Sequence, residues 1–218
     1  MTSAGERSPA GGPSTGPVLV VLASGNGSNA KAVIDACSDG RLLARVAAVV
    51  SNVADAGVLM RAEAAGVPTV VVEGRAGEVR SAYDLRLAAA VGAYEPDWVV
   101  LAGWMRILTM DFLGRFPNRV VNLHPALPGE LPGTDAIERA WHEARAGTRT
   151  RTGVMVHLVP DEGVDVGPVL GVRTLPIDPT ETLAELEARV HAAEHELLVA
   201  TLTDLVLGGP APSVAAHN

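Results

Sequence analysis

Runs of four to six consecutive apolar residues alternate along this chain with stretches in which apolar residues recur every three or four positions. The short runs have the length and composition of strands buried in a parallel sheet, and the periodic stretches are typical of helices with one buried face. We therefore expect strands at 18–23, 46–50, 67–72, 98–101, 120–124, 153–159 and 169–172. Helices are expected from 30 to 39, at about 54–65, 81–94 and 135–146, and in a short turn ending near 116.

The last helix is expected to begin at residues 178–181. An Asp cap, a proline at the first position and a glutamate at the third are a favourable helix start. Its buried stripe would consist of Leu183, Leu186, Val190, Ala193 and Leu197. The alternation of strands and helices predicts a single doubly wound α/β domain, with a mostly parallel central sheet and helices on both faces. We place this domain at 17–208, between a disordered tail at 1–16 and a flexible tail at 209–218.

Composition narrows the class of protein. Of the 218 residues, 48% are hydrophobic and 19% charged, as in a globular domain, and only 3% are aromatic, so the core must be aliphatic. The formal charge of −8 argues against a nucleic-acid partner, and no apolar run approaches the length of a membrane span. Cys37 is the only cysteine, which excludes an intrachain disulfide and favours a cytoplasmic protein.

The strand at 120–124 carries two polar residues at its carboxyl end. Asn122 and His124 are two positions apart, so both side chains point to the same side of an extended chain, and Pro125 ends the strand. Ligands of open α/β sheets bind beyond the carboxyl ends of the strands. Taken alone, the pair is more simply interpreted as the end of a strand whose polar groups bond to loop backbone.

A glycine-rich loop, Ser-Gly-Asn-Gly-Ser-Asn at 24–29, joins the first strand to the first helix. Glycines let the backbone approach an anion, and the N-terminal amides of the helix then point at it. A dinucleotide fingerprint would also require an acid at the end of the second strand, where the chain has Ser51 and Asn52. A phosphate monoester suits the loop better than a nicotinamide cofactor. A tight turn that binds nothing is the remaining interpretation.

Asp165 lies in the glycine-flanked loop Gly-Val-Asp-Val-Gly-Pro, where an Asp on its own would be read as a turn former. Four separated motifs now coincide: the loop 24–29, Leu-Ala-Gly-Trp-Met-Arg-Ile-Leu at 101–108, Asn-Leu-His-Pro-Ala-Leu at 122–127 and Asp-Val-Gly-Pro at 165–168. Together they resemble the phosphoribosylglycinamide formyltransferases, the folate-dependent enzymes of purine synthesis, over about residues 18–207. The resemblance implies a Rossmann-like formyltransferase fold, formyl transfer from 10-formyltetrahydrofolate to 5'-phosphoribosylglycinamide, and no metal.

The resemblance also assigns roles to individual residues. Asn122, His124 and Asp165 match the catalytic trio, and Asn122 also contacts the folate. The residues that would bind the phosphoribosyl substrate are Gly27, Ser28, Asn29 and Glu194. Those that would bind the folate are Arg80, Met105, Arg106, Ile107 and Leu108. Pattern alone would make the arginines and Glu194 surface charges, and Met105, Ile107 and Leu108 ordinary core. Three histidines on expected helices, His142, His191 and His195, are interpreted as solvated or partly buried side chains.

In the implied mechanism, Asn122 stabilises an oxyanion and His124 supplies a proton, with Asp165 expected to raise the pKa of His124. The chain departs from the family motif at Ala126, Pro128 and Gly129 and carries extra residues around 146–151, and we expect these changes to affect the folate loops more than the chemistry. We expect a monomer or homodimer. The alternative functions are those of a methionyl-tRNA formyltransferase, a formyltetrahydrofolate hydrolase, and a non-catalytic folate- or nucleotide-binding protein. The first of these would need room for an RNA-binding domain after Leu207.

Overall fold

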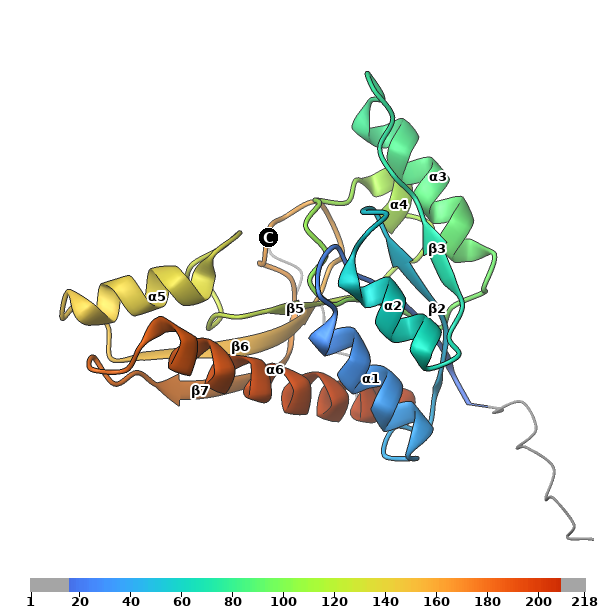
Figure 1. Cartoon of the computed structure of the whole chain (residues 1–218). Coiled ribbons are helices and arrows are strands. Elements are labelled where there is room, and N and C mark those ends of the chain that lie inside the picture. Colours follow the sequence, from blue (N-terminus) through green and yellow to red (C-terminus); the bar gives the residue numbers. More distant parts are fainter. Residues whose placement is uncertain (1–15, 209–218) are drawn as a thin grey trace, which may run out of the picture.

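The computed structural model describes residues 16–208, so the two expected tails lie outside the described residues except for Gly16. In this part of the chain, seven strands form one sheet in the order β3-β2-β1-β4-β5-β6-β7 (Figure 1). The strands are β1 (Val18–Leu22), β2 (Arg45–Ser51), β3 (Thr69–Val71), β4 (Trp98–Leu101), β5 (Val120–His124), β6 (Arg151–Leu158) and β7 (Val169–Pro176). Strands β1 to β5 pair in parallel, whereas β6 and β7 are antiparallel. The predicted mostly parallel sheet is confirmed.

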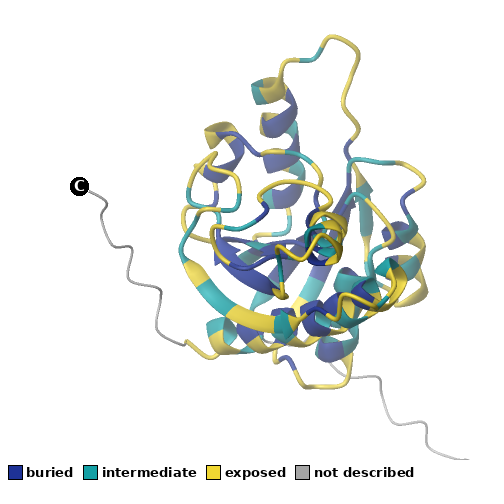
Figure 2. Ribbon diagram, turned by 90° about the vertical axis from the view of Figure 1, so that its left-hand side faces the viewer, coloured by how far each residue is buried: buried dark blue, intermediate teal, exposed yellow. Residues whose placement is uncertain are grey.

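Helices cover both faces of the sheet, also as predicted. The helices are α1 (Ser28–Ser38), α2 (Gly57–Ala64), α3 (Arg80–Gly92), α4 (Met110–Leu113), α5 (Ala136–Arg145) and α6 (Leu183–Val206). One aliphatic core joins α1, α2, α5 and α6 to the sheet, and a second core joins α3 and α4 to the other face. Buried residues accordingly concentrate in the sheet and on the inner sides of the helices (Figure 2).

The strand order reverses between β1 and β4. From β1 the chain moves outward to β2 and β3, then returns to pair β4 with the opposite side of β1. The loops that leave the carboxyl ends of β1 and β4 therefore diverge, which opens a crevice at this edge of the sheet. Ser24 ties the two loops together: its amide donates to the Gly103 carbonyl at 3.0 Å, and its hydroxyl accepts from the Met105 amide at 2.9 Å.

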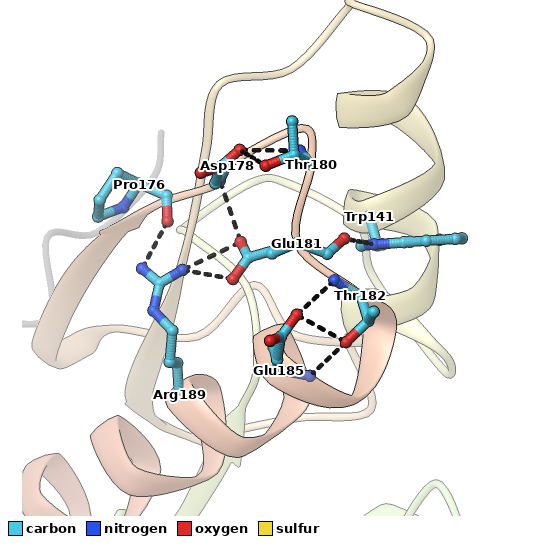
Figure 3. A network of polar contacts seen from close by, with 8 residues as sticks. All are labelled: Trp141, Pro176, Asp178, Thr180, Glu181, Thr182, Glu185 and Arg189. Atoms are coloured by element: carbon cyan, nitrogen blue, oxygen red, sulfur yellow. Dashed lines mark hydrogen bonds and ion pairs between the residues drawn. The ribbon is translucent and has the colours of Figure 1, made fainter.

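The start of the last helix was predicted wrongly. Helix α6 begins at Leu183, and its cap is Thr182: the Thr182 hydroxyl accepts from the Glu185 amide, and the Glu185 carboxylate accepts from the Thr182 amide at 2.8 Å. Asp178 instead closes a turn, in which its carboxylate accepts from the Thr180 amide at 2.8 Å (Figure 3).

The sequence contains two consecutive cap signals, Asp178-x-x-Glu181 and Thr182-x-x-Glu185, and contacts outside this segment select the second. The Glu181 carboxylate accepts from Arg189 at 2.7 Å, and the Glu181 carbonyl accepts from the Trp141 indole at 2.9 Å (Figure 3). These contacts fix Glu181 in the turn, so the helix starts four residues later than expected.

Smaller differences concern the ends of elements. Strand β3 is shorter than the expected 67–72, and α1 starts at Ser28 rather than residue 30. In α6 the buried stripe includes Leu198, while Leu197 is only half-buried. Within residues 16–208, none of the helices is both long enough and apolar enough to cross a membrane.

Candidate active site

Asn122 and His124 occupy the carboxyl end of β5, the strand next to the crevice. Val121 and Leu123 point into the core shared with α1 and α6, so Asn122 and His124 point to the opposite side of the strand, as the two-residue period predicts. Asn122 is half-buried, and His124 is only 4% exposed.

Asp165 reaches the same point from the loop between β6 and β7. Its Oδ1 accepts from Asn122 Nδ2 at 3.1 Å, and its Oδ2 lies 3.4 Å from His124 Nδ1. Oδ2 also accepts from the Gly133 amide at 2.9 Å. Asp165 has a positive φ of 56°, an uncommon conformation for a residue with a side chain. The three residues singled out from the sequence therefore lie in contact, although they are far apart along the chain.

His157 is a fourth member of this group that the sequence analysis missed. It stands opposite Asn122 in the antiparallel pairing of β5 with β6, and its Nε2 lies 3.1 Å from Asn122 Nδ2. The Leu158 carbonyl lies 2.8 Å from His157 Nδ1 and accepts a hydrogen bond from it, which leaves Nε2 as an acceptor. Two acceptors, His157 Nε2 and the Asp165 carboxylate, therefore fix the orientation of the Asn122 amide.

Asp165 acts on the pKa of His124 in the expected upward direction, but the net shift is downward. Burial lowers the pKa of His124 below its ordinary value, and this effect outweighs the opposing influence of the Asp165 charge. Since Nε2 lies 3.1 Å from the Leu131 carbonyl, the neutral ring carries its proton there and leaves a lone pair on Nδ1, which faces Asp165. Burial by itself would raise the pKa of Asp165, but hydrogen bonding to its carboxylate, including that from the Gly133 amide, outweighs burial and lowers the pKa below its ordinary value, so the carboxylate is ionised at neutral pH.

The loop after β5 contributes two backbone groups to the site. The Leu131 carbonyl and the Gly133 amide contact His124 and Asp165, and both residues have positive φ, 46° and 82°. The extra segment near 146–151 supports this loop, because Arg149 forms ion pairs with Glu130 and with Glu143. The 146–151 segment therefore contacts, through Glu130, the loop that carries Leu131 and Gly133. That the departures affect the folate loops more than the chemistry stays a prediction.

The trio opens onto a cleft of about 530 Å³, a volume typical of small-molecule sites. Met105, Arg106, Ile107 and Leu108 line one wall, and Asn29 and Glu194 line another part of it. Met105 is 68% exposed and Ile107 47%, so these two are not core residues, although Leu108 is buried. Within the described residues, Gly27, Ser28 and Arg80 are not part of the cleft lining.

The three charged residues expected to bind the substrates, Arg80, Arg106 and Glu194, are each engaged by a neighbour. The Arg80 guanidinium lies 3.2 Å from the Glu162 carboxylate, so it reaches the cleft only through Glu162, which lines it. Arg106 stacks over the Tyr83 ring at 4.1 Å. Glu194 is 4% exposed and accepts from His191 Nδ1 at 2.6 Å, a hydrogen bond that raises the pKa of His191.

The glycine loop supplies an uncapped helix N-terminus beside this cleft. Gly27 precedes α1 with φ of 80°, and no side chain caps the helix. A Cβ on Gly27 would lie 2.5 Å from the Val58 side chain, so only glycine fits. The Asn29 Oδ1 atom is buried without a hydrogen-bond partner among the described residues.

Comparison with known proteins identifies the class. A sequence model of the formyl transferase family matches residues 18–202, so the chain belongs to that class. Phosphoribosylglycinamide formyltransferase of Dictyostelium discoideum is 40% identical over 84% of this chain and 95% of its own length. The Mycobacterium tuberculosis protein of the same name is 42% identical over 90% of this chain and 88% of its own length. The crystal structure of glycinamide ribonucleotide transformylase 1 from Symbiobacterium toebii superposes with a TM-score of 0.83 at 36% identity, over 88% of each chain. This chain belongs to the phosphoribosylglycinamide formyltransferase family.

Proposed function

We propose that this protein transfers the formyl group of 10-formyltetrahydrofolate to the amine of 5'-phosphoribosylglycinamide in de novo purine biosynthesis. The observation that carries the proposal is the contact of Asn122, His124 and Asp165 at one end of a cleft whose other walls include Asn29 and Glu194. Family membership supports the reaction type, since the relatives named above carry the name of this activity.

The cleft offers two chemically different surfaces for two substrates. Met105 and Ile107 present exposed apolar side chains that suit a flat folate ring, and Arg106 adds a cation for an acidic group. The free amides at the start of α1, Gly27 to Asn29, suit a phosphate. Glu194 is a hydrogen-bond acceptor for the hydroxyl or amine groups of the ribonucleotide. Arg80 would join the folate site by exchanging Glu162 for a folate carboxylate.

The chemistry proposed for the trio is acid–base assistance to direct amine attack. The substrate amine forms a bond to the formyl carbon, and its proton moves to His124 Nδ1, the nitrogen that holds a lone pair in this structure. The ionised Asp165, 3.4 Å away, stabilises the imidazolium that results. His124 then returns the proton to the folate nitrogen as the carbon–nitrogen bond to the folate breaks, so His124 ends the cycle neutral.

Asn122 is assigned to the oxyanion that develops on the formyl oxygen. Both hydrogens of its amide are engaged in this structure, with His157 and Asp165 as acceptors. The formyl oxygen would have to share or replace one of these acceptors. A donor held in place before the reaction typically contributes about 10²–10³ in rate.

Turnover measurements test this proposal. Absorbance monitoring of folate release with 5'-phosphoribosylglycinamide and a formylated folate analogue should show product formation that requires both substrates. Asn122→Ala and His124→Ala should each lose at least about 100-fold in kcat. Release of formate with water as the acceptor would instead indicate a hydrolase, and near wild-type turnover by either variant would remove that residue from the mechanism. With its net charge and single cysteine, we expect the enzyme to work in the cytoplasm as a monomer or homodimer, on small molecules and without nucleic acid or membrane.

A further inference from the structure

Arg61 on α2 contacts the glycine loop at one residue through two hydrogen bonds. Its Nε donates to the Asn26 carbonyl at 2.8 Å, and its Nη2 donates to the Asn26 side-chain oxygen at 2.9 Å. The planar guanidinium thus grips the backbone and the side chain of Asn26 at the same time, over a separation of 35 residues in sequence. Among the described residues, Arg61 is not part of the cleft lining.

The first turn of α2 makes further contacts with the same loop. The Val58 amide donates to the Gly25 carbonyl at 3.1 Å, and a Cβ on Gly57 would lie 3.2–3.3 Å from atoms of Asn26. Gly27 packs against Val58 so closely that a Cβ there would overlap with it. The loop therefore rests directly on α2, and Arg61 adds two side-chain hydrogen bonds to these contacts.

We propose that Arg61 is a positioning residue for the substrate phosphate, acting through Asn26. Asn26 immediately precedes Gly27, and Gly27 to Asn29 are the residues whose amides are proposed to hold the phosphate. The direction of those amides depends on the orientation of the peptide that Arg61 holds. The inference rests on the proposed function, because it concerns the binding of a phosphorylated substrate at this loop.

Loss of the two hydrogen bonds between Arg61 and Asn26 should weaken binding of the phosphate and leave kcat unchanged. Two partly exposed hydrogen bonds to a charged group, each of modest net strength, correspond to a loss in affinity of about 5- to 20-fold. The effect should be absent for a ligand without a phosphate. A residue with a merely structural role would instead change stability, kcat and the KM for folate together.

Calorimetric titration without folate provides the test, with 5'-phosphoribosylglycinamide and its dephosphorylated riboside as ligands. Arg61→Ala should bind the phosphorylated ligand about 5- to 20-fold more weakly and the riboside unchanged. Arg61→Lys should resemble Arg61→Ala, because an ammonium keeps the charge and loses the two-point geometry. Arg45→Ala, an exposed site at the start of β2, removes the same charge and should match the wild type.

Several results would overturn the proposal. One is an unchanged affinity of Arg61→Ala for the phosphorylated ligand, and another is an equal loss of affinity for both ligands. A third is wild-type affinity of Arg61→Lys, which would show that the positive charge alone, and not the two-point geometry, causes the effect. If Arg61→Ala does not fold, Asn26→Ala, which removes only the side-chain acceptor, should weaken the phosphorylated ligand by about 2- to 5-fold; no change would overturn the proposal. A wild type that binds the phosphorylated ligand tightly but transfers no formyl group would refute the proposed function and leave the role of Arg61 standing. A wild type that binds both ligands equally would refute the role of Arg61 alone.

Discussion

Asp165→Asn is the substitution that most closely preserves shape while removing the charge at the centre of the site. The carboxylate accepts from two donors, Asn122 Nδ2 and the Gly133 amide, at 3.1 and 2.9 Å. An asparagine at 165 has one oxygen, so in either orientation of its amide one of the two donors faces another N–H group. An unsatisfied buried donor costs about 1–3 kcal/mol.

The same substitution removes the counter-ion of the imidazolium that is proposed to form on His124. At 3.4 Å the Coulomb attraction amounts to about 5 kcal/mol at an effective dielectric constant of ~20, and this is an upper bound for the loss. We expect kcat/KM to fall by about 10²–10³-fold, with the larger part in kcat, because the imidazolium exists only during the reaction. The acid limb of the pH profile should move to lower pH, because the Asp165 charge opposes the lowering of the pKa of His124.

Steady-state kinetics over a range of pH values, combined with thermal unfolding of the same variant, measures both effects. Asp204→Asn, on α6 ten residues beyond Glu194, is a matched control that should leave kcat/KM unchanged. If Asp165→Asn folded normally and kept kcat/KM within about threefold of the wild type, the assignment of Asp165 as the partner of His124 would be refuted.

Three further predictions follow from individual contacts. Because burial lowers the pKa of His124 and the neutral ring is the proton acceptor, kcat/KM of the wild type should fall on the acid side with a midpoint below the ordinary value of 6.5; a midpoint above it would contradict this protonation state. Gly27→Ala should destabilise the fold by more than about 2 kcal/mol and raise the KM for the phosphorylated substrate. The control Gly40→Ala, with the same φ of 80° but open space around the residue, should lower the free energy of unfolding by only about 1–2 kcal/mol. Equal unfolding temperatures for the two variants would refute the close packing of Gly27 on Val58. Thr182→Ala should lower the free energy of unfolding by about 0.5–2 kcal/mol without changing kcat. A larger loss of stability for Asp178→Ala would contradict Thr182 as the cap and support the start predicted from the sequence.

Local periodicity was sufficient to predict much of this fold. The alternation along β5 placed Asn122 and His124 on the same side, because this pattern depends only on the geometry of a single element. For the same reason Leu186, Val190 and Ala193 of the expected stripe on α6 are buried. The parallel order of β1 to β5 likewise follows from the helices that connect them.

The remainder depends on contacts between elements. His157 meets Asn122 through the register of an antiparallel pair, which the sequence of β6 alone does not specify. The Leu131 carbonyl and the Gly133 amide act through backbone groups of a loop, so their residue types carry no signal of the role. The direction of the pKa shift of His124 depends on how deeply the ring is buried, and the motif contains no information on that depth.

The fate of an isotope-labelled formyl group tests the central claim most directly. With ¹³C-formyl-labelled 10-formyltetrahydrofolate and 5'-phosphoribosylglycinamide, the wild type should deliver the label to the substrate amine, detected by NMR as a new formamide signal, and His124→Ala should form this product at least about 100-fold more slowly. Label found only as free formate, or delivered equally fast by His124→Ala, would contradict the account.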